Sequence, residues 1–269
     1  MEPPPAFRTD LYRGTAAYYD QYRPPYPSAL FDDLRRRLPI SGRGRLLDLA
    51  CGTGQIAFPL AGDFAEVVAV DQEAETIDFA RSKAEAAGMT QIRWMIGAAE
   101  TLALEGPFEL VAVGNAFHRL DRSRLAERTL DWLQPGGGVA LVWGDLPTQG
   151  ERPWQKTLEC LFAEWMDRAG ARERLPEGWA AAIETDPHED VLRRAGLAYA
   201  GRFEFSAEQT WTIESLTGLA YSTSILNRGA LGGLADDFAS ALAEGLLAAV
   251  PDGIFRQEAT YAYELARKP

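Results

Sequence analysis

Cysteine and histidine are scarce in this chain. Its 269 residues include two cysteines, Cys51 and Cys160, and two histidines, His118 and His188. Structural zinc sites need clusters of such residues, and disulfide frameworks need several cysteine pairs. The sequence therefore contains no pattern for either, and we expect no bound metal. Both cysteines are predicted to be reduced packing residues.

Long apolar runs are also missing. No stretch approaches the roughly 20 apolar residues that span a bilayer. The residues from Met1 to Pro5 lack the basic and hydrophobic parts of a signal peptide. We therefore expect a cytoplasmic protein with no membrane partner. With 46% hydrophobic residues, the chain can still bury one substantial core with an elaboration over it.

Positive charge is in short supply. The chain has 27 Lys and Arg against 39 Asp and Glu, which gives a net charge of −12. A surface of this charge repels nucleic acid unless one strongly basic face exists. The short run Arg35, Arg36 and Arg37 is typical of a solvated helix end before Pro39. We expect a small-molecule ligand and no nucleic-acid partner.

The most informative segment runs from Leu46 to Gly54. An apolar strand pattern ends there in a glycine-rich turn that carries a carboxylate, Asp48. Glycine at positions 52 and 54 permits positive φ and a close ligand approach, and the helix that follows offers N–H groups at its start. This geometry suits either a dinucleotide or S-adenosylmethionine (SAM).

Asp48 favours SAM in this choice. Residues 52–57 match the dinucleotide fingerprint G-x-G-x-x-G/A, and Asp71 lies near the distance expected of a ribose-binding acid. However, a pyrophosphate on this turn would face a negative side chain. SAM instead brings an ammonium and a sulfonium, which a carboxylate attracts by about a few kcal/mol in a partly buried site.

Further strand patterns follow this turn. They cover residues 66–71, 92–100, 108–118 and 133–143, and a helix pattern at 74–87 ends at Gly88. Asp71 ends the first of these strands and suits ribose hydroxyls, whereas the small residues Ala98 and Ala99 could lie against an adenine. Alternating strands and helices predict a parallel sheet with helices on both faces.

Together these segments resemble the class I SAM-dependent methyltransferases, within them the small-molecule, natural-product type. In that group a Tyr-Arg-Pro-x-Tyr-Pro stretch precedes the first motif, here Tyr22 to Pro27. The resemblance runs from about Tyr18 to the C-terminus. One departure is Ala50, which with Cys51 precedes Gly52 where the family often has D-x-G-x-G-x-G. Ala50 is a small substitution and leaves the assignment standing.

The resemblance implies roles for individual residues. Asp48, Gly52 and Gly54 would surround the methionine moiety, Asp71 would bind ribose, and Asn115 would close over the sulfur side. Ala99 and Glu100 would flank the adenine. The full set that we expect to bind the cofactor is Tyr22, Arg23, Asp48, Ala50, Gly52, Thr53, Gly54, Asp71, Gln72, Ala98, Ala99, Glu100, Asn115 and Ala116.

The resemblance also implies the architecture. We expect a Rossmann-like, doubly wound, mostly parallel seven-stranded sheet with a terminal antiparallel hairpin and a helical lid. Residues 1–40 would form an N-terminal helical cover, 41–145 the SAM-binding core, and 146–269 the lid together with the last strands of the same sheet. Within that last region we expect strands at 200–205 and 259–265, and helices over 213–250 with a break near 229–233.

Catalysis would need little from the protein, because the sulfonium of SAM already activates the methyl group. His118 is the candidate base, since it follows the fourth strand, and Tyr18 and Tyr19 could contact the sulfonium or the acceptor. His188 is expected to be structural. The expected acceptor-binding residues are Phe117, His118, Trp143, Asp145, Trp179 and Tyr221.

The acidic charge and the aromatic lid favour a neutral or cationic acceptor, led by an amine-bearing natural product such as an amino sugar, with phenols and carboxylic acids next. Two alternatives stay open beside methyl transfer. One is an NAD-type oxidoreductase, and the other is a protein that binds SAM without transferring its methyl group. Either a monomer or a homodimer is compatible with the sequence.

Overall fold

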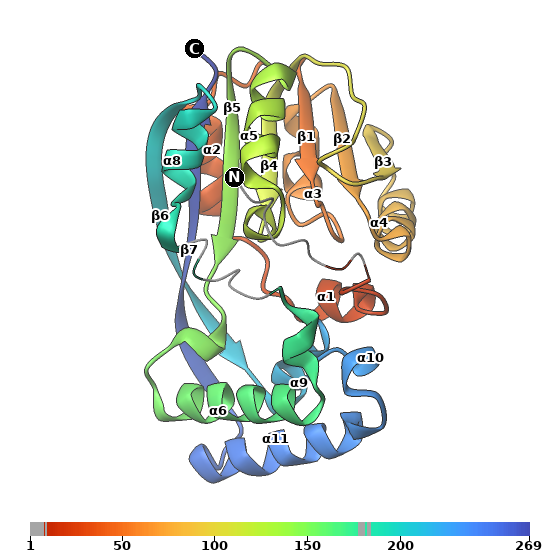
Figure 1. Cartoon of the computed structure of the whole chain (residues 1–269), viewed down its shortest axis with the longest axis vertical. Coiled ribbons are helices and arrows are strands. Elements are labelled where there is room, and N and C mark those ends of the chain that lie inside the picture. Colours follow the sequence, from red (N-terminus) through yellow and green to blue (C-terminus); the bar gives the residue numbers. More distant parts are fainter. Residues whose placement is uncertain (1–7, 9, 177–180, 182–183) are drawn as a thin grey trace.

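A seven-stranded sheet forms the centre of the described part of the chain, in the order β3-β2-β1-β4-β5-β7-β6 (Figure 1). The computed structural model describes residues 8, 10–176, 181 and 184–269. The strands are β1 (Arg45–Leu49), β2 (Glu66–Asp71), β3 (Ile92–Ile96), β4 (Phe108–Gly114), β5 (Leu133–Gly144), β6 (Ala198–Trp211) and β7 (Phe255–Arg267). The first five are parallel, and β7 runs antiparallel to β5 and β6. The predicted α/β class with a terminal antiparallel hairpin is confirmed.

Helices cover both faces of the sheet (Figure 1). On one face lie α2 (Ser28–Arg37), α3 (Ala57–Leu60) and α4 (Ala74–Ala86), and on the other lie α5 (Arg122–Trp132) and α8 (His188–Arg194). Strand residues alternate between the two: Leu46 faces α2, and its neighbour Leu47 faces the other layer. Burial on both faces explains the nearly continuous apolar sequence of these strands.

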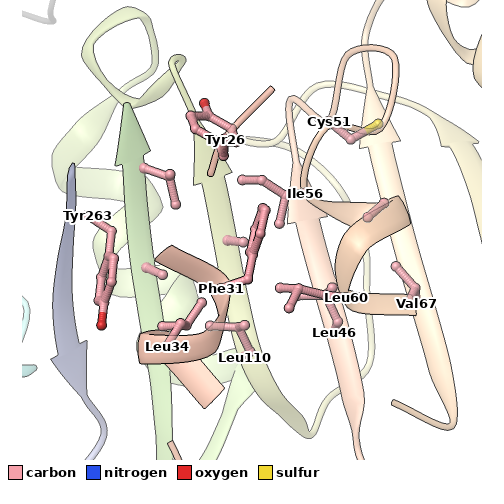
Figure 2. Close-up of a cluster of buried hydrophobic side chains, with 14 of the residues drawn as sticks. Tyr26, Phe31, Leu34, Leu46, Cys51, Ile56, Leu60, Val67, Leu110 and Tyr263 are labelled. Carbon is pink, nitrogen blue, oxygen red and sulfur yellow. The ribbon is translucent and has the colours of Figure 1, made fainter. Parts of the chain in front are cut away.

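Figure 2 shows the cluster under α2. Phe31 and Leu34 of this helix lie over Leu46, Leu110 and Tyr263 of the sheet. Because α2 is buried against the sheet, it belongs to the core. This corrects the expectation that residues 1–40 form a cover throughout. Of the described residues in this region, those before α2 that lie outside the sheet layers are Arg8, residues 10–15, α1 (Ala16–Tyr22) and residues 23–25 (Figure 1).

A second group of helices packs away from the main sheet layers, and we call it the helical subdomain. It consists of α6 (Pro153–Arg168), α9 (Ile213–Tyr221), α10 (Arg228–Leu231) and α11 (Ala235–Ala249). Its own apolar cluster includes Phe238, Leu242 and Leu246, which recur every four residues along α11. Trp211 and Phe255, at the far ends of β6 and β7, join the same cluster.

The last two strands are longer than the sequence predicted. We expected strands at 200–205 and 259–265, whereas β6 and β7 pair continuously from Ala198 with Arg267 to Trp211 with Phe255. Their far halves leave the main sheet and reach the helical subdomain (Figure 1). Side chains on β6 alternate between half-buried and exposed, because only one face of this extension is packed. Of the helices that the structure describes, none combines the length and apolar character needed to cross a membrane.

Candidate functional site

A cavity of about 420 Å³ lies at the carboxyl ends of β1, β2 and β4. In open parallel sheets this edge is where ligands bind. Ten of the residues singled out from the sequence line it: Tyr19, Ala50, Gly52, Asp71, Gln72, Ala98, Ala99, Glu100, Asn115 and Ala116. Residues that are far apart in the sequence thus meet around one space.

The turn after β1 forms the floor of this cavity. Ala50, Gly52 and Gly54 have φ values of 51°, 54° and 89°. A Cβ at Gly54 would lie 2.6 Å from the Phe58 ring, so only glycine fits there without movement. Gly52 faces Tyr19 across the cavity, where a Cβ would come 3.9 Å from the ring. The backbone at Gly52 is therefore open to a ligand.

Asp48 lies beneath this turn and does not line the cavity. Its side chain is buried at 1% exposure, and its Oδ2 accepts a hydrogen bond from the Ala57 amide at 3.0 Å. Burial raises the pKa of Asp48 to about 8, although the Ala57 amide opposes the shift. This corrects the expected direct contact with the methionine moiety: Asp48 supports the start of α3 from below. Thr53 is likewise buried under the turn.

Asp71 is the acid that reaches the cavity. Its Oδ2 accepts from the Gly52 amide at 2.9 Å, and its Oδ1 accepts from the Glu73 amide at 3.0 Å. Burial raises the pKa of Asp71, and the amides of Glu73, Gly52 and Gln72 oppose that shift. Asp71 thus holds the glycine turn in place while its carboxylate faces the ligand space.

The other end of the cavity is built from small residues. Gly97, Ala98 and Ala99 follow β3, and the Glu100 carboxylate accepts from the Asp121 amide at 3.3 Å. Between the two ends, Asn115 adopts a positive φ of 49°, and its amide donates to the Val142 carbonyl. This places Asn115 and Ala116 against the middle of the space.

The outer wall comes from residues that the sequence did not indicate. We call Arg8 and Asp10–Thr15 the N-terminal strap, of which Arg8, Leu11, Tyr12 and Thr15 line the cavity. The Leu11 carbonyl accepts from Asn227 Nδ2 at 3.0 Å, and the Gly14 amide donates to Glu75 Oε2 at 2.8 Å. No local pattern could reveal this wall, because the strap is held by distant parts of the chain. Glu73, Thr76, Arg119, Leu120 and Asp121 complete it.

Three of the predicted cofactor and catalytic residues on α1 and just after it face the helical subdomain instead. Tyr22 donates its hydroxyl proton to Glu214, and Arg23 Nε donates to Ser222 Oγ at 2.8 Å. The Tyr18 ring packs edge-on against Tyr221, 5.3 Å between centres. Tyr221 in turn donates to the Ala235 carbonyl. Tyr18, Tyr22, Arg23 and Tyr221 thus join α1 to the subdomain and lie outside the cavity lining.

Tyr19 is the residue of α1 that enters the cavity. Its side chain is half-buried, and burial raises the pKa of its hydroxyl, with the charges of Arg23 and Arg119 opposing. The Arg23 guanidinium lies 5.1 Å from the centre of the Tyr19 ring. Tyr19 therefore stays protonated at neutral pH beside the ligand space.

The geometry speaks against His118 as a base. Burial, followed by the charge of Arg119, lowers the pKa of His118 to about 3. Its Nε2 accepts a hydrogen bond from Arg119 Nε at 3.1 Å. A nitrogen with so little affinity for a proton, already used as an acceptor, is poorly suited to remove one from a substrate.

The remaining predicted acceptor residues are held by contacts outside the cavity lining. The rings of Phe117 and Trp143 pack against His188, at 5.1 and 6.3 Å between centres. Asp145 Oδ2 accepts from the Thr260 amide at 3.1 Å and links β5 to β7. None of these three residues lines the cavity. Trp179 lies outside the described residues.

The cavity residues fit SAM. Gly52 leaves the backbone open at one end, the half-buried Asp71 carboxylate offers acceptors for ribose hydroxyls, and the small residues 97–99 leave space for adenine. Glu73 Oε1 is buried without a hydrogen-bond partner among the described residues, and it also lines this space. An unsatisfied buried acceptor is consistent with a ligand that donates.

Comparisons with known proteins agree with this geometry. Residues 46–137 match the family described as methyltransferase domain. An uncharacterized methyltransferase of Mycobacterium tuberculosis is 34% identical over 161 residues, which is 59% of this chain and 61% of the relative. A ubiquinone biosynthesis O-methyltransferase of Cereibacter sphaeroides is 34% identical over 176 residues, which is 63% of this chain and 66% of the relative. Each match spans less than two thirds of the relative's own length.

Solved structures share the fold. A candidate type II methyltransferase from Anaeromyxobacter dehalogenans superposes with a TM-score of 0.62 over 91% of this chain and 97% of that chain, at 22% identity. At this identity the likeness concerns the fold alone. The family match, in contrast, includes the turns after β1, β2 and β3 that build the sheet side of the cavity. The match of residues 46–137 and the fold together support a class I SAM-dependent methyltransferase with SAM as its cofactor.

Proposed function

We propose that this protein transfers a methyl group from SAM to a nitrogen or oxygen of a small molecule. The observation that carries the proposal is the cavity itself, which combines an open glycine backbone, a half-buried carboxylate and a small-residue end in the order that SAM requires. The N-terminal strap covers it from outside, so a bound ligand would be shielded from water.

The roles of the residues follow from their positions. Asp71 would bind the ribose, residues 97–100 the adenine, and Gly52 with Asn115 the methionyl part. Bound SAM supplies an activated methyl group on its sulfonium. The protein has to align an acceptor with that group, and this alignment alone can contribute several kcal/mol to the lowering of the barrier.

Proton removal has a minor part in this proposal. Tyr19 stays protonated, because burial raises its pKa, and His118 is a weak base with a pKa of about 3. An amine needs only to be neutral when it attacks, whereas a hydroxyl must lose its proton. The wall therefore suits an amine acceptor, and an amine-bearing natural product such as an amino sugar is the first class to test. The net charge of −12 favours the approach of such a cation.

The two alternatives differ in how they now stand. The match of residues 46–137 to a methyltransferase domain speaks against the NAD-type oxidoreductase. A protein that binds SAM without transferring methyl would share the same turn and the same acid, so binding alone does not separate it from an enzyme. Product formation does.

The experiment has two stages. Calorimetry with S-adenosylhomocysteine (SAH) and with NAD tests the cofactor, and we expect only SAH to bind. Incubation with isotope-labelled SAM and a panel of amino sugars, other amines, phenols and carboxylic acids then tests transfer by mass spectrometry of the products. Binding of NAD in preference to SAH contradicts the cofactor assignment, and SAH binding without transfer to any class supports the non-catalytic alternative.

A further inference from the structure

A second cavity lies where the chain passes from the sheet to the helical subdomain. It has a volume of about 370 Å³, and its lining comes from the end of β5, the short 3₁₀ helix η3 (Pro147–Gln149), the start of α6 and β7. It shares no lining residue with the cavity that we assign to SAM, so methyl transfer does not explain it. Its volume lies within the range of about 300–1,000 Å³ that is usual for small-molecule sites.

Two buried glutamines line this second cavity. Gln155 on α6 is 3% exposed, and Gln257 on β7 is 6% exposed. Their Oε1 atoms accept hydrogen bonds from groups that can only donate, the Arg152 amide and Trp211 Nε1, each at 3.2 Å. These donors fix the direction of both side-chain amides. Each Nε2 atom has no hydrogen-bond partner among the described residues, so both keep N–H donors for a ligand.

Gly150 leaves the space that the Gln155 amide occupies. A Cβ at Gly150 would lie 2.0 Å from Gln155 Nε2 and 2.1 Å from its Oε1, so any other residue would displace this amide. The backbone at Gly150 has a φ of −93° and a ψ of 170°, which other residues also adopt. The need for glycine here therefore comes from the close amide alone. Because Gly150 also lines the second cavity, the amide lies at the surface of that cavity.

The charge of this lining is negative. Three carboxylates and one guanidinium contribute to it, those of Asp145, Glu151, Glu258 and Arg152. Glu151 is paired with Lys156 at 3.0 Å. Asp145 and Glu258 have no ion-pair partner among the residues that the structure describes. The lining therefore favours a cation and disfavours an anion.

The pairing of β6 with β7 adds to the negative charge. Glu258 lies directly opposite Glu208 of β6, so the two side chains share one face of the hairpin. Like charges in this arrangement destabilise a sheet, and a cation bound beside Glu258 would offset their repulsion. The described residues include no group of three or more His, Cys, Asp or Glu placed to hold a metal ion. An organic cation therefore suits this cavity better than a metal.

We infer that the second cavity binds a small organic cation that carries both an amine and hydroxyl groups, as an amino sugar or an amino alcohol does. The ammonium would donate to Asp145 and Glu258, and the hydroxyl oxygens would accept from Nε2 of Gln155 and of Gln257. Asp145 suits this role because its Oδ2 is held by the Thr260 amide, which leaves Oδ1 for a ligand. The inference does not depend on methyl transfer.

The test is calorimetry on the full chain, without cofactor, with three probes: glucosamine, glucose, which lacks the amine, and cyclohexylamine, which lacks the hydroxyls. We expect glucosamine to bind about tenfold or more tightly than either of the others. In Glu258→Gln and Asp145→Asn, which keep the size but not the charge, glucosamine should bind about tenfold more weakly. Gly150→Ala, which displaces the Gln155 amide, should weaken glucosamine and leave cyclohexylamine unchanged.

Glu244→Gln is the matched control, since it removes the same charge at an exposed site on α11 outside both cavities, and glucosamine affinity should be unchanged. SAH should bind all variants as it binds the wild type, which also shows that they are folded. Three results overturn the inference: no glucosamine binding by the wild type, equal affinity for glucosamine and cyclohexylamine, or undiminished glucosamine affinity in Glu258→Gln and Asp145→Asn. A wild type that binds glucosamine but not SAH contradicts the proposed function and supports this inference.

Discussion

Asp48 shows how burial changes what a single side chain can do. The sequence places a carboxylate beside a glycine turn, and a carboxylate in water would be ionised at neutral pH. In the structure the group is enclosed beneath the turn, with the Ala57 amide as its hydrogen-bond donor. Burial raises its pKa to about 8, so it is largely protonated at neutral pH in the absence of a ligand. Its effect on a cationic ligand is thereby weakened and indirect.

The raised pKa of Asp48 predicts a dependence of stability on pH. Between pH 3.8 and about 8 the folded protein holds a proton on Asp48 that the unfolded chain releases. The contribution of Asp48 to the free energy of unfolding is therefore fully present at low pH. As pH rises through this range, the free energy of unfolding falls by up to about 1.4 kcal/mol per pH unit. Asp48→Asn cannot ionise, so denaturant unfolding at several pH values should show the wild type losing stability relative to it as pH increases. The control is Asp237→Asn, at an exposed site on α11. Its free energy of unfolding should depend on pH in the same way as that of the wild type. A constant difference between wild type and Asp48→Asn would show that the pKa is not raised.

Substitution of Asp71, unlike that of Asp48, is expected to weaken ligand binding directly. Asp71→Ala removes the acceptor of the Gly52 and Glu73 amides and the proposed ribose contact. We expect SAH to bind about 1–3 kcal/mol more weakly, measured by calorimetry. Asp78→Ala, an exposed position on α4, is the control. Unchanged SAH affinity in Asp71→Ala would reject the ribose role.

At the scale of elements, α1 connects the cavity to the helical subdomain. Tyr19 faces the cavity, while Tyr18 and Tyr22 face α9. Gly218 of α9 lies directly under the Tyr22 ring, where a Cβ would come within 2.2 Å of ring carbons. The absence of a side chain at Gly218 therefore permits the close approach of the two helices.

Gly218→Ala tests this packing. Alanine favours a helix by about 1 kcal/mol over glycine, but the clash with Tyr22 should outweigh this gain and lower the free energy of unfolding by about 1–3 kcal/mol. SAH affinity should fall as well, because displacement of α1 moves Tyr19. Gly245→Ala on α11 is the matched control, since the nearest atoms to its Cβ would belong to the flexible Leu161 side chain, the closest at 3.1 Å. In a Tyr22→Ala background the cost of Gly218→Ala should largely vanish, and an undiminished cost there would contradict the proposed clash.

The sequence predicted the elements whose signal is local. Strand β2 and the turn after β1 were found because apolar runs and glycines that need positive φ leave a pattern within a few residues. The outer wall was not found, because Tyr12 and Arg119 reach it through contacts between segments far apart in the chain. The sequence also did not predict where the Asp48 side chain points. Alternation along β1 does not say which side chain will bond the start of the helix that follows.

At the scale of the whole molecule, the buried apolar side chains form three separate clusters. Two lie on the faces of the sheet, and the third lies inside the helical subdomain. The third cluster touches the sheet through the far ends of β6 and β7, where Trp211 Nε1 donates to Gln257 Oε1 at 3.2 Å. The long β6 and β7 strands thus connect the subdomain to the sheet, as Figure 1 shows.

This division predicts that the helical subdomain opens before the sheet does. Phe238 is fully buried at the centre of the third cluster, in contact with the rings of Trp165 and Tyr221. Phe238→Ala should cost about 3–5 kcal/mol, concentrated in the subdomain. Amide hydrogen exchange should accelerate in α6 and α11 while β1 and β4 keep their protection. Leu247→Ala on the same helix, at a site 42% exposed, should change neither. If β1 and β4 lose protection in step with α11 in Phe238→Ala, the two parts unfold as one cooperative unit and the subdomain does not open separately.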